Sequence, residues 1–138
     1  MNIVKSTLIV GLLASSLFGG EAQVETKLAS DMRSMLKALS EIQAAGFYAD
    51  EVTIKSATKR LVSNLDSLIE SDMTQYLSVK KINAQKFAQK RVRMIEMYAD
   101  DLLVSVENRD YSDAIEDYSE ILRQCVSCHS RLRKDSWQ

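Results

Sequence analysis

After residue 22 the chain contains no proline and only one glycine, Gly46. Strands need turn residues at roughly ten-residue intervals, whereas a helix can continue for many turns without them. The chain also has no low-complexity stretch and no internal repeat beyond a helical period. We therefore expect long helices with short connections, and the predicted fold class is all-α.

Apolar residues recur at steps of three and four in four stretches, which predicts four amphipathic helices. They are expected over about residues 24–45, 50–70, 71–107 and 110–132. Gly46 is expected to end the first helix by adopting a positive φ, and Asp110 to cap the fourth. The four stripes are Leu28, Met32, Met35, Leu39 and Ile42; Ile54, Ala57, Leu61, Leu65 and Leu68; Ala88, Val92, Ile95, Ala99, Leu102 and Val106; and Ala114, Ile115, Tyr118, Ile121, Leu122 and Cys125.

Four helices that each carry one apolar stripe have few ways to bury those stripes together. An antiparallel four-helix bundle is the simplest arrangement for helices joined by short connections. The absence of glycine or proline between the second and third helices leaves that boundary the least well defined.

Residues 1–22 have the layout of a secretory signal peptide: a basic start, an apolar stretch of 13 residues from Ser6 to Phe18, and small residues at Gly20 and Ala22. The stretch is shorter than the ~20 residues that span a bilayer, so a membrane anchor is the less favoured alternative. We therefore expect an exported, periplasmic domain of residues 23–138.

Charge in the mature chain is nearly balanced. Loss of Lys5 and Glu21 leaves 17 basic and 18 acidic residues from the 18 and 19 of the full chain. This balance predicts no general affinity for nucleic acid or for anionic membranes.

The only two cysteines and the only histidine lie within five positions, as Cys125-Val-Ser-Cys128-His129. This is the C-x-x-C-H pattern of c-type haem attachment. Two thiols one helical turn apart can each add to one vinyl group of a haem, forming two thioether bonds. His129, four residues after Cys125, can then reach the iron from the proximal side. The expected cofactor is one covalently attached haem c, near the C-terminal end of the fourth helix.

The motif has three possible uses other than haem attachment. A thioredoxin-type dithiol would sit at a strand-to-helix turn, whereas this motif lies within a helical pattern. Zinc would need ligands beyond these three, and only carboxylates are available. A structural disulfide closing so small a loop would add little stability. A haem-free thiol-disulfide redox protein therefore remains an alternative function.

This layout, with one C-x-x-C-H near the end of an exported helical chain, resembles the cytochrome c-prime and cytochrome c-556 family. Arg133 matches the family's arginine after the motif, whereas Leu132 stands where members usually have an aromatic residue. The resemblance implies a four-helix fold, one-electron transfer between periplasmic proteins, and in many members a homodimer. The remaining residues of the chain do not assemble into a general base, a nucleophile or a substrate pocket, so we expect the protein not to be an enzyme.

The distal side of the iron decides between two functions. In an antiparallel bundle the start of the first helix lies beside the end of the fourth. The first helix there carries Met32 and Met35 on its apolar stripe, on the other side of the iron from His129. A methionine ligand would give a low-spin iron suited to electron transfer, resembling the c-556 branch. If both are core filler, an open site would bind NO or CO, resembling the c-prime branch. Met ligation is favoured, with Met32 ahead of Met35.

Several other residues are expected to serve structure. Met94 and Met97 are predicted to pack in the core, and Tyr111 and Tyr118 to be core residues with hydroxyls at its edge. Trp137 is expected to rest on the bundle. The basic residues could pair with haem propionates or steer an acidic partner; they are Lys86, Lys90, Arg91, Arg93, Arg131, Arg133 and Lys134.

Overall fold

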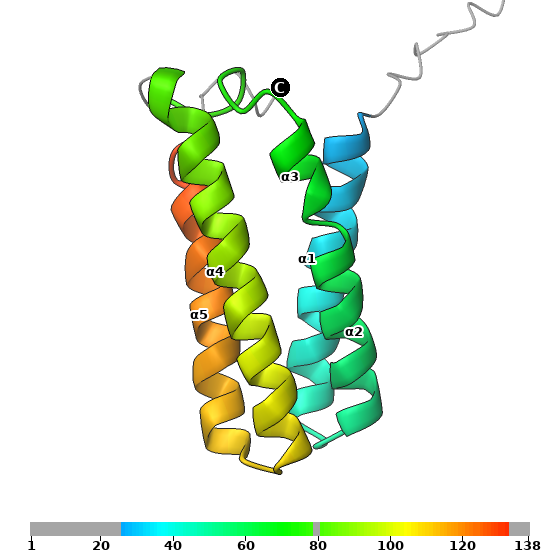
Figure 1. Ribbon diagram of the computed structural model, residues 1–138. Coiled ribbons are helices and arrows are strands. Elements are labelled where there is room, and N and C mark those ends of the chain that lie inside the picture. Colours follow the sequence, from blue (N-terminus) through cyan, green and yellow to red (C-terminus); the bar gives the residue numbers. More distant parts are fainter. Residues whose placement is uncertain (1–25, 79–80, 133–138) are drawn as a thin grey trace, which may run out of the picture.

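The computed structural model describes residues 26–78 and 81–132, and every regular element within them is a helix (Figure 1). The helices are α1 (Lys27–Gly46), α2 (Glu51–Ser63), α3 (Asp66–Glu70), α4 (Lys81–Glu107) and α5 (Tyr111–His129). The expectation of an all-α chain is confirmed. The expected signal peptide, Arg133, Lys134 and Trp137 lie outside the described residues.

The helices form two hairpins that lie side by side (Figure 1). α1 packs chiefly on α2 and α5 chiefly on α4, while α2 and α3 join the hairpins by contacting α4. α1 and α5 run in opposite directions, so that the start of α1 and the end of α5 lie at the same end of the molecule. These two helices make little direct contact with each other.

The helix starts follow from capping residues. Thr26 Oγ1 accepts from the N–H of Ala29, Asp50 Oδ1 from that of Thr53, and Asp110 Oδ1 from that of Asp113, at 3.1 to 3.2 Å. Each bond satisfies an N–H that has no partner within its helix. The predicted cap at Asp110 is confirmed.

Both hairpin turns use the same device. Ala49 and Arg109 have φ values of 50° and 58°, and each immediately precedes a capping aspartate. The N–H of Asp50 then bonds back to Ala45 O and that of Asp110 to Ser105 O. Positive φ was expected at Gly46, and this prediction is wrong: Gly46 has no positive φ and is the last residue of α1.

The second and third helices differ from prediction between residues 63 and 81. The second helix breaks at Asn64 and Leu65 into α2 and α3, and α4 begins seven to ten residues after the start that was expected within residues 71–74. Ser67 in this region and Thr58 within α2 are buried, and their hydroxyls donate to backbone carbonyls three and four residues earlier, respectively. The segment 71–78 forms turns, in which Asp72 Oδ1 accepts from the N–H of Thr74.

The core is built from the predicted stripes. Every stripe residue of the second and third predicted helices is buried, as are Leu28, Met35, Leu39 and Ile42 of α1. The fourth stripe is only partly right, because Ile115 and Leu122 are exposed. Met97, predicted to be buried, is about half exposed, since it lies on the outer side of α4.

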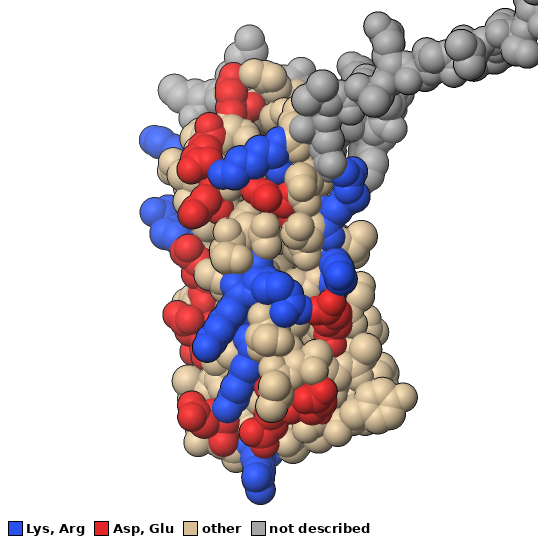
Figure 2. Space-filling model, turned by 90° about the vertical axis from the view of Figure 1, so that its right-hand side faces the viewer, with Lys and Arg blue, Asp and Glu red and all other residues tan. Residues whose placement is uncertain are grey.

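Charged side chains of both signs alternate over the molecular face that Figure 2 presents. The ion pairs of the described residues are mostly exposed, such as Lys27–Glu70 and Arg109–Glu51. Pairs of this kind contribute little to stability. Packing of the apolar stripes therefore holds the helices together.

Candidate functional site

The motif occupies the last turn and a half of α5. Cys125 and Cys128 are free thiols; Cys128 is 9% exposed, Cys125 is partly buried against the core, and His129 is exposed. The i, i+3 spacing puts both sulfur atoms on one side of the helix, one turn apart. The helix periodicity of the core residues Ile121 and Gln124 continues through Cys128.

Burial controls the protonation of both thiols. It raises the pKa of Cys125 to about 11, with a smaller contribution from the neighbouring Cys128. It also raises the pKa of Cys128, although Arg91 and Arg131 oppose the effect. Both groups are therefore protonated at neutral pH. Reactive dithiols have lowered pKa values, often at the N-terminus of a helix, whereas this motif lies at a C-terminus.

A segment distant in sequence anchors the end of α5. The carbonyl of Arg131 accepts hydrogen bonds from the N–H of Ser78 at 2.7 Å and from its hydroxyl at 2.9 Å. Leu77 and Leu132 pair across the same contact, and Leu77 is fully buried. The turn after His129 is thus fixed by the loop that precedes α4. No pattern in the sequence predicts this contact.

One hydrogen bond sets the register between α5 and α1. The hydroxyl of Tyr118 donates to the carbonyl of Leu39 at 3.1 Å. Cys125 lies seven residues after Tyr118, and Met32 lies seven residues before Leu39. Because the helices are antiparallel, both steps run about 10.5 Å toward the same end. Met32 is therefore level with Cys125, and Met35 is about one turn farther from His129.

The two methionines occupy different surroundings. Met35 is 6% exposed and belongs to the buried core, whereas Met32 is only partly buried and packs at its edge. Gln43 lies three turns after Met32 on the same side of α1, and it lines a cavity shared with α5. On α5, His129 likewise lies three turns after Tyr118, which lines the same cavity. Met32 thus shares a side of α1 with Gln43, and His129 shares a side of α5 with Tyr118.

The cavity itself has a volume of about 410 Å³ and lies toward the far end of these helices. It is lined mainly by apolar and aromatic residues, among them Ile42, Phe47, Val106, Tyr111 and Tyr118. The prediction is confirmed for Tyr118, which packs partly buried against the core and whose hydroxyl donates to the carbonyl of Leu39. Tyr111 is partly buried, and its hydroxyl lies 3.5 Å from Oε1 of Glu51. The cavity shows that α1 and α5 are incompletely packed against each other.

Apolar side chains remain exposed beside the motif. Leu122 and Val126 on α5 are 36% and 64% exposed, and Leu36 on α1 is 64% exposed. Leu36 lies one turn after Met32, and Leu122 lies one turn after Tyr118. In the register set by Tyr118 and Leu39, Leu36 and Leu122 fall at nearly the same height. They border the poorly packed side of the molecule.

Comparison of the chain with protein family models, with curated proteins and with solved structures gives no significant match. Within residues 26–78 and 81–132, no three His, Cys, Asp or Glu side chains are grouped so that they could hold a metal ion. None of the described helices has the length and apolar composition needed to cross a membrane.

Proposed function

We propose that this chain is an exported monohaem c-type cytochrome that carries single electrons between periplasmic partners. The observation that carries the proposal is the arrangement of Cys125, Cys128 and His129: two free thiols one turn apart, followed at once by the only histidine of the chain. A haem bound there would supply an iron that gains and loses one electron.

Each residue of the motif has a separate task in this proposal. Cys125 and Cys128 would hold the haem through two thioether bonds, each formed by addition of S–H across one vinyl double bond with no net oxidation. His129 would supply the imidazole that binds the iron. Because the turn after His129 is bonded to Ser78, the end of α5 is held while the anchored group lies against it.

The surroundings fit a large, flat, mainly apolar group. Leu36, Leu122 and Val126 are exposed. Full burial of an exposed side chain of this size stabilises by roughly 1.5–3 kcal/mol, and each of the three would gain the part of this that corresponds to its exposed fraction. Contact between α1 and α5 is limited in the part of the chain that the structure describes, and these side chains stay exposed there. An antiparallel four-helix bundle, with haem near the C-terminal end of its last helix, accounts for both features.

Met32 is the preferred distal ligand. It is level with Cys125 in the register of Tyr118 and Leu39, and it lies at the core edge rather than within the packed core. Met35 is buried among core residues, where a flexible thioether serves packing. Without a methionine ligand, the same site would bind NO or CO, as in cytochromes c-prime.

The raised thiol pKa values argue against the alternative of a haem-free thiol-disulfide protein. Such a protein needs a thiolate near neutral pH, and burial keeps both thiols protonated. The proposed electron carrier is not an enzyme.

An absorption spectrum tests the function. The mature chain, produced in a bacterium with the c-type maturation system, should give a low-spin haem spectrum in both oxidation states and should not respond to carbon monoxide. A high-spin spectrum that changes on adding carbon monoxide would replace electron transfer with gas binding. A colourless protein with a redox-active disulfide would replace it with thiol chemistry.

A further inference from the structure

Two guanidinium groups share one aromatic ring beside the motif. The Cζ atoms of Arg91 on α4 and Arg131 after α5 lie 5.1 and 5.0 Å from the centroid of the Phe87 ring. Each contact is favourable as a cation–π interaction, but two positive charges near the same ring repel each other. Among the described residues, no carboxylate forms an ion pair with either arginine.

Arg91 is incompletely satisfied. One terminal nitrogen, Nη1, donates to Oε1 of Gln124 at 2.8 Å, and Gln124 is only 2% exposed. The Nε–H of Arg91 is buried and has no hydrogen-bond partner. An unsatisfied buried donor costs about 1–3 kcal/mol, and more when the group is charged. The neutral amide of Gln124 does not compensate the charge.

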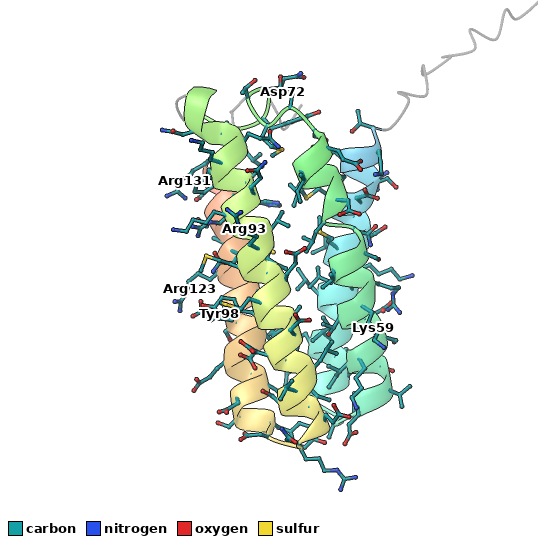
Figure 3. All side chains as sticks on the ribbon, viewed as in Figure 1. Lys59, Asp72, Arg93, Tyr98, Arg123 and Arg131 are labelled. Atoms are coloured by element: carbon teal, nitrogen blue, oxygen red, sulfur yellow. The ribbon has the colours of Figure 1, made fainter. Side chains whose placement is uncertain are left out.

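The arginine pair borders the haem attachment motif. Both guanidinium groups lower the pKa of the Cys128 thiol, against the larger effect of burial. Arg131 follows His129 by two residues, and its side chain donates to the carbonyl of Ser127 at 2.7 Å. Figure 3 shows Arg131 beside the upper part of α5, at the end of the molecule that carries the motif.

We propose that Arg91 and Arg131 form the carboxylate site that holds the haem propionates, an inference that rests on the haem attachment proposed above. A guanidinium presents Nε and a terminal nitrogen as a fork that matches a carboxylate. A propionate would give the buried Nε–H of Arg91 an acceptor, and its negative charge would reduce the repulsion between the two arginines. Partly buried carboxylates in turn require such partners.

The test is the pH dependence of the reduction potential of the haem-loaded protein. In that protein the two thiols would be thioethers and His129 would be bound to iron, so neither the thiols nor the imidazole would titrate, and the propionates would titrate in their place. Arg91→Gln should raise the redox-linked propionate pKa by about one to two units, because a cation at hydrogen-bond distance lowers a carboxyl pKa by that amount. Arg91→Lys, which keeps the charge without the fork, should give a smaller shift.

Arg93→Gln is the matched control, since it removes the same charge from an exposed position on the same helix. Its titration should coincide with that of the unaltered protein. If Arg91→Gln does not accumulate with haem, the same titration is made on Arg131→Gln. Arg131 is exposed, so its replacement should be tolerated, and the propionate pKa should again rise. If all haem-loaded variants titrate like Arg93→Gln, the proposal of an arginine site is overturned, while the proposed haem attachment stands. An unaltered protein without covalent haem would overturn the proposed function first.

Discussion

The hydroxyl of Tyr118 donates to the main-chain carbonyl of Leu39 at 3.1 Å, and this bond joins two helices that otherwise make little contact. Tyr118 is partly buried, and desolvation raises its phenol pKa. The bond is therefore made away from full competition with water. It fixes which residues of α1 and α5 stand opposite each other.

Replacement of Tyr118 by phenylalanine should lower the free energy of unfolding by about 0.5–1.5 kcal/mol, because a partly buried carbonyl loses its side-chain donor. Urea denaturation followed by circular dichroism measures the change. Tyr111→Phe is the control, since its hydroxyl lies 3.5 Å from Glu51 and should contribute less. Equal losses in the two variants would show that the Tyr118 bond has no special role.

The register predicts different consequences for the two methionines. Met32→Ala should convert the haem-loaded protein from low spin to high spin, because it removes the proposed ligand. Met35→Ala should keep the low-spin spectrum but lose about 2–5 kcal/mol of stability, since a buried side chain leaves a cavity. Absorption spectra and urea denaturation separate these effects. A high-spin Met35→Ala protein beside a low-spin Met32→Ala protein would reverse the assignment.

Thiol alkylation tests the burial of the motif in the haem-free chain. With a pKa of about 11 for Cys125, only a small fraction is thiolate at pH 8, and the thiolate is the reactive species. The rate of alkylation of a Cys128→Ser variant by iodoacetamide should rise about tenfold per pH unit between pH 8 and 10. Unfolding in urea should expose the thiol, so that the slow alkylation of the folded protein is lost. Rapid alkylation of the folded chain at pH 7 would contradict the buried, protonated thiol.

The positive φ of Ala49 predicts a stabilising substitution. Ala49→Gly should raise the free energy of unfolding by about 0.5–1 kcal/mol, because glycine adopts this conformation without the steric cost of a Cβ atom. Ala44→Gly, at an exposed position inside α1, should lower it by a similar amount. Thermal unfolding of both variants measures the difference. Destabilisation by both substitutions would contradict the strained turn.

Much of the fold could be predicted because helical periodicity is written into the spacing of apolar residues. The stripes of Leu61 and Val92, for example, led directly to buried positions. The break at Asn64 was missed because no glycine or proline marks it; the N–H of Asn64 bonds to two carbonyls at the end of α2 instead. The prediction for Gly46 was wrong because glycine can adopt a positive φ but need not do so. The positive φ of this turn is adopted by Ala49 instead.

The candidate site also has one part that could be predicted from the sequence and another part that could not. The spacing of Cys125, Cys128 and His129 is local, so the sequence alone identified it. The contacts of Ser78 with Arg131, and of Arg91 with Gln124, join residues 53 and 33 positions apart. No local pattern reports such pairs. The unsatisfied Nε of Arg91 depends on burial and became apparent only in three dimensions.

Covalent haem attachment is tested most directly by extraction. The mature protein, produced in cells with the c-type maturation system, is denatured, and its haem is partitioned into acidified organic solvent. The haem should stay with the polypeptide, and its intact mass should exceed that of the mature chain by one haem. A Cys125→Ser, Cys128→Ser variant should release or lack it. A colourless unaltered protein with the mass of the bare chain would contradict the account.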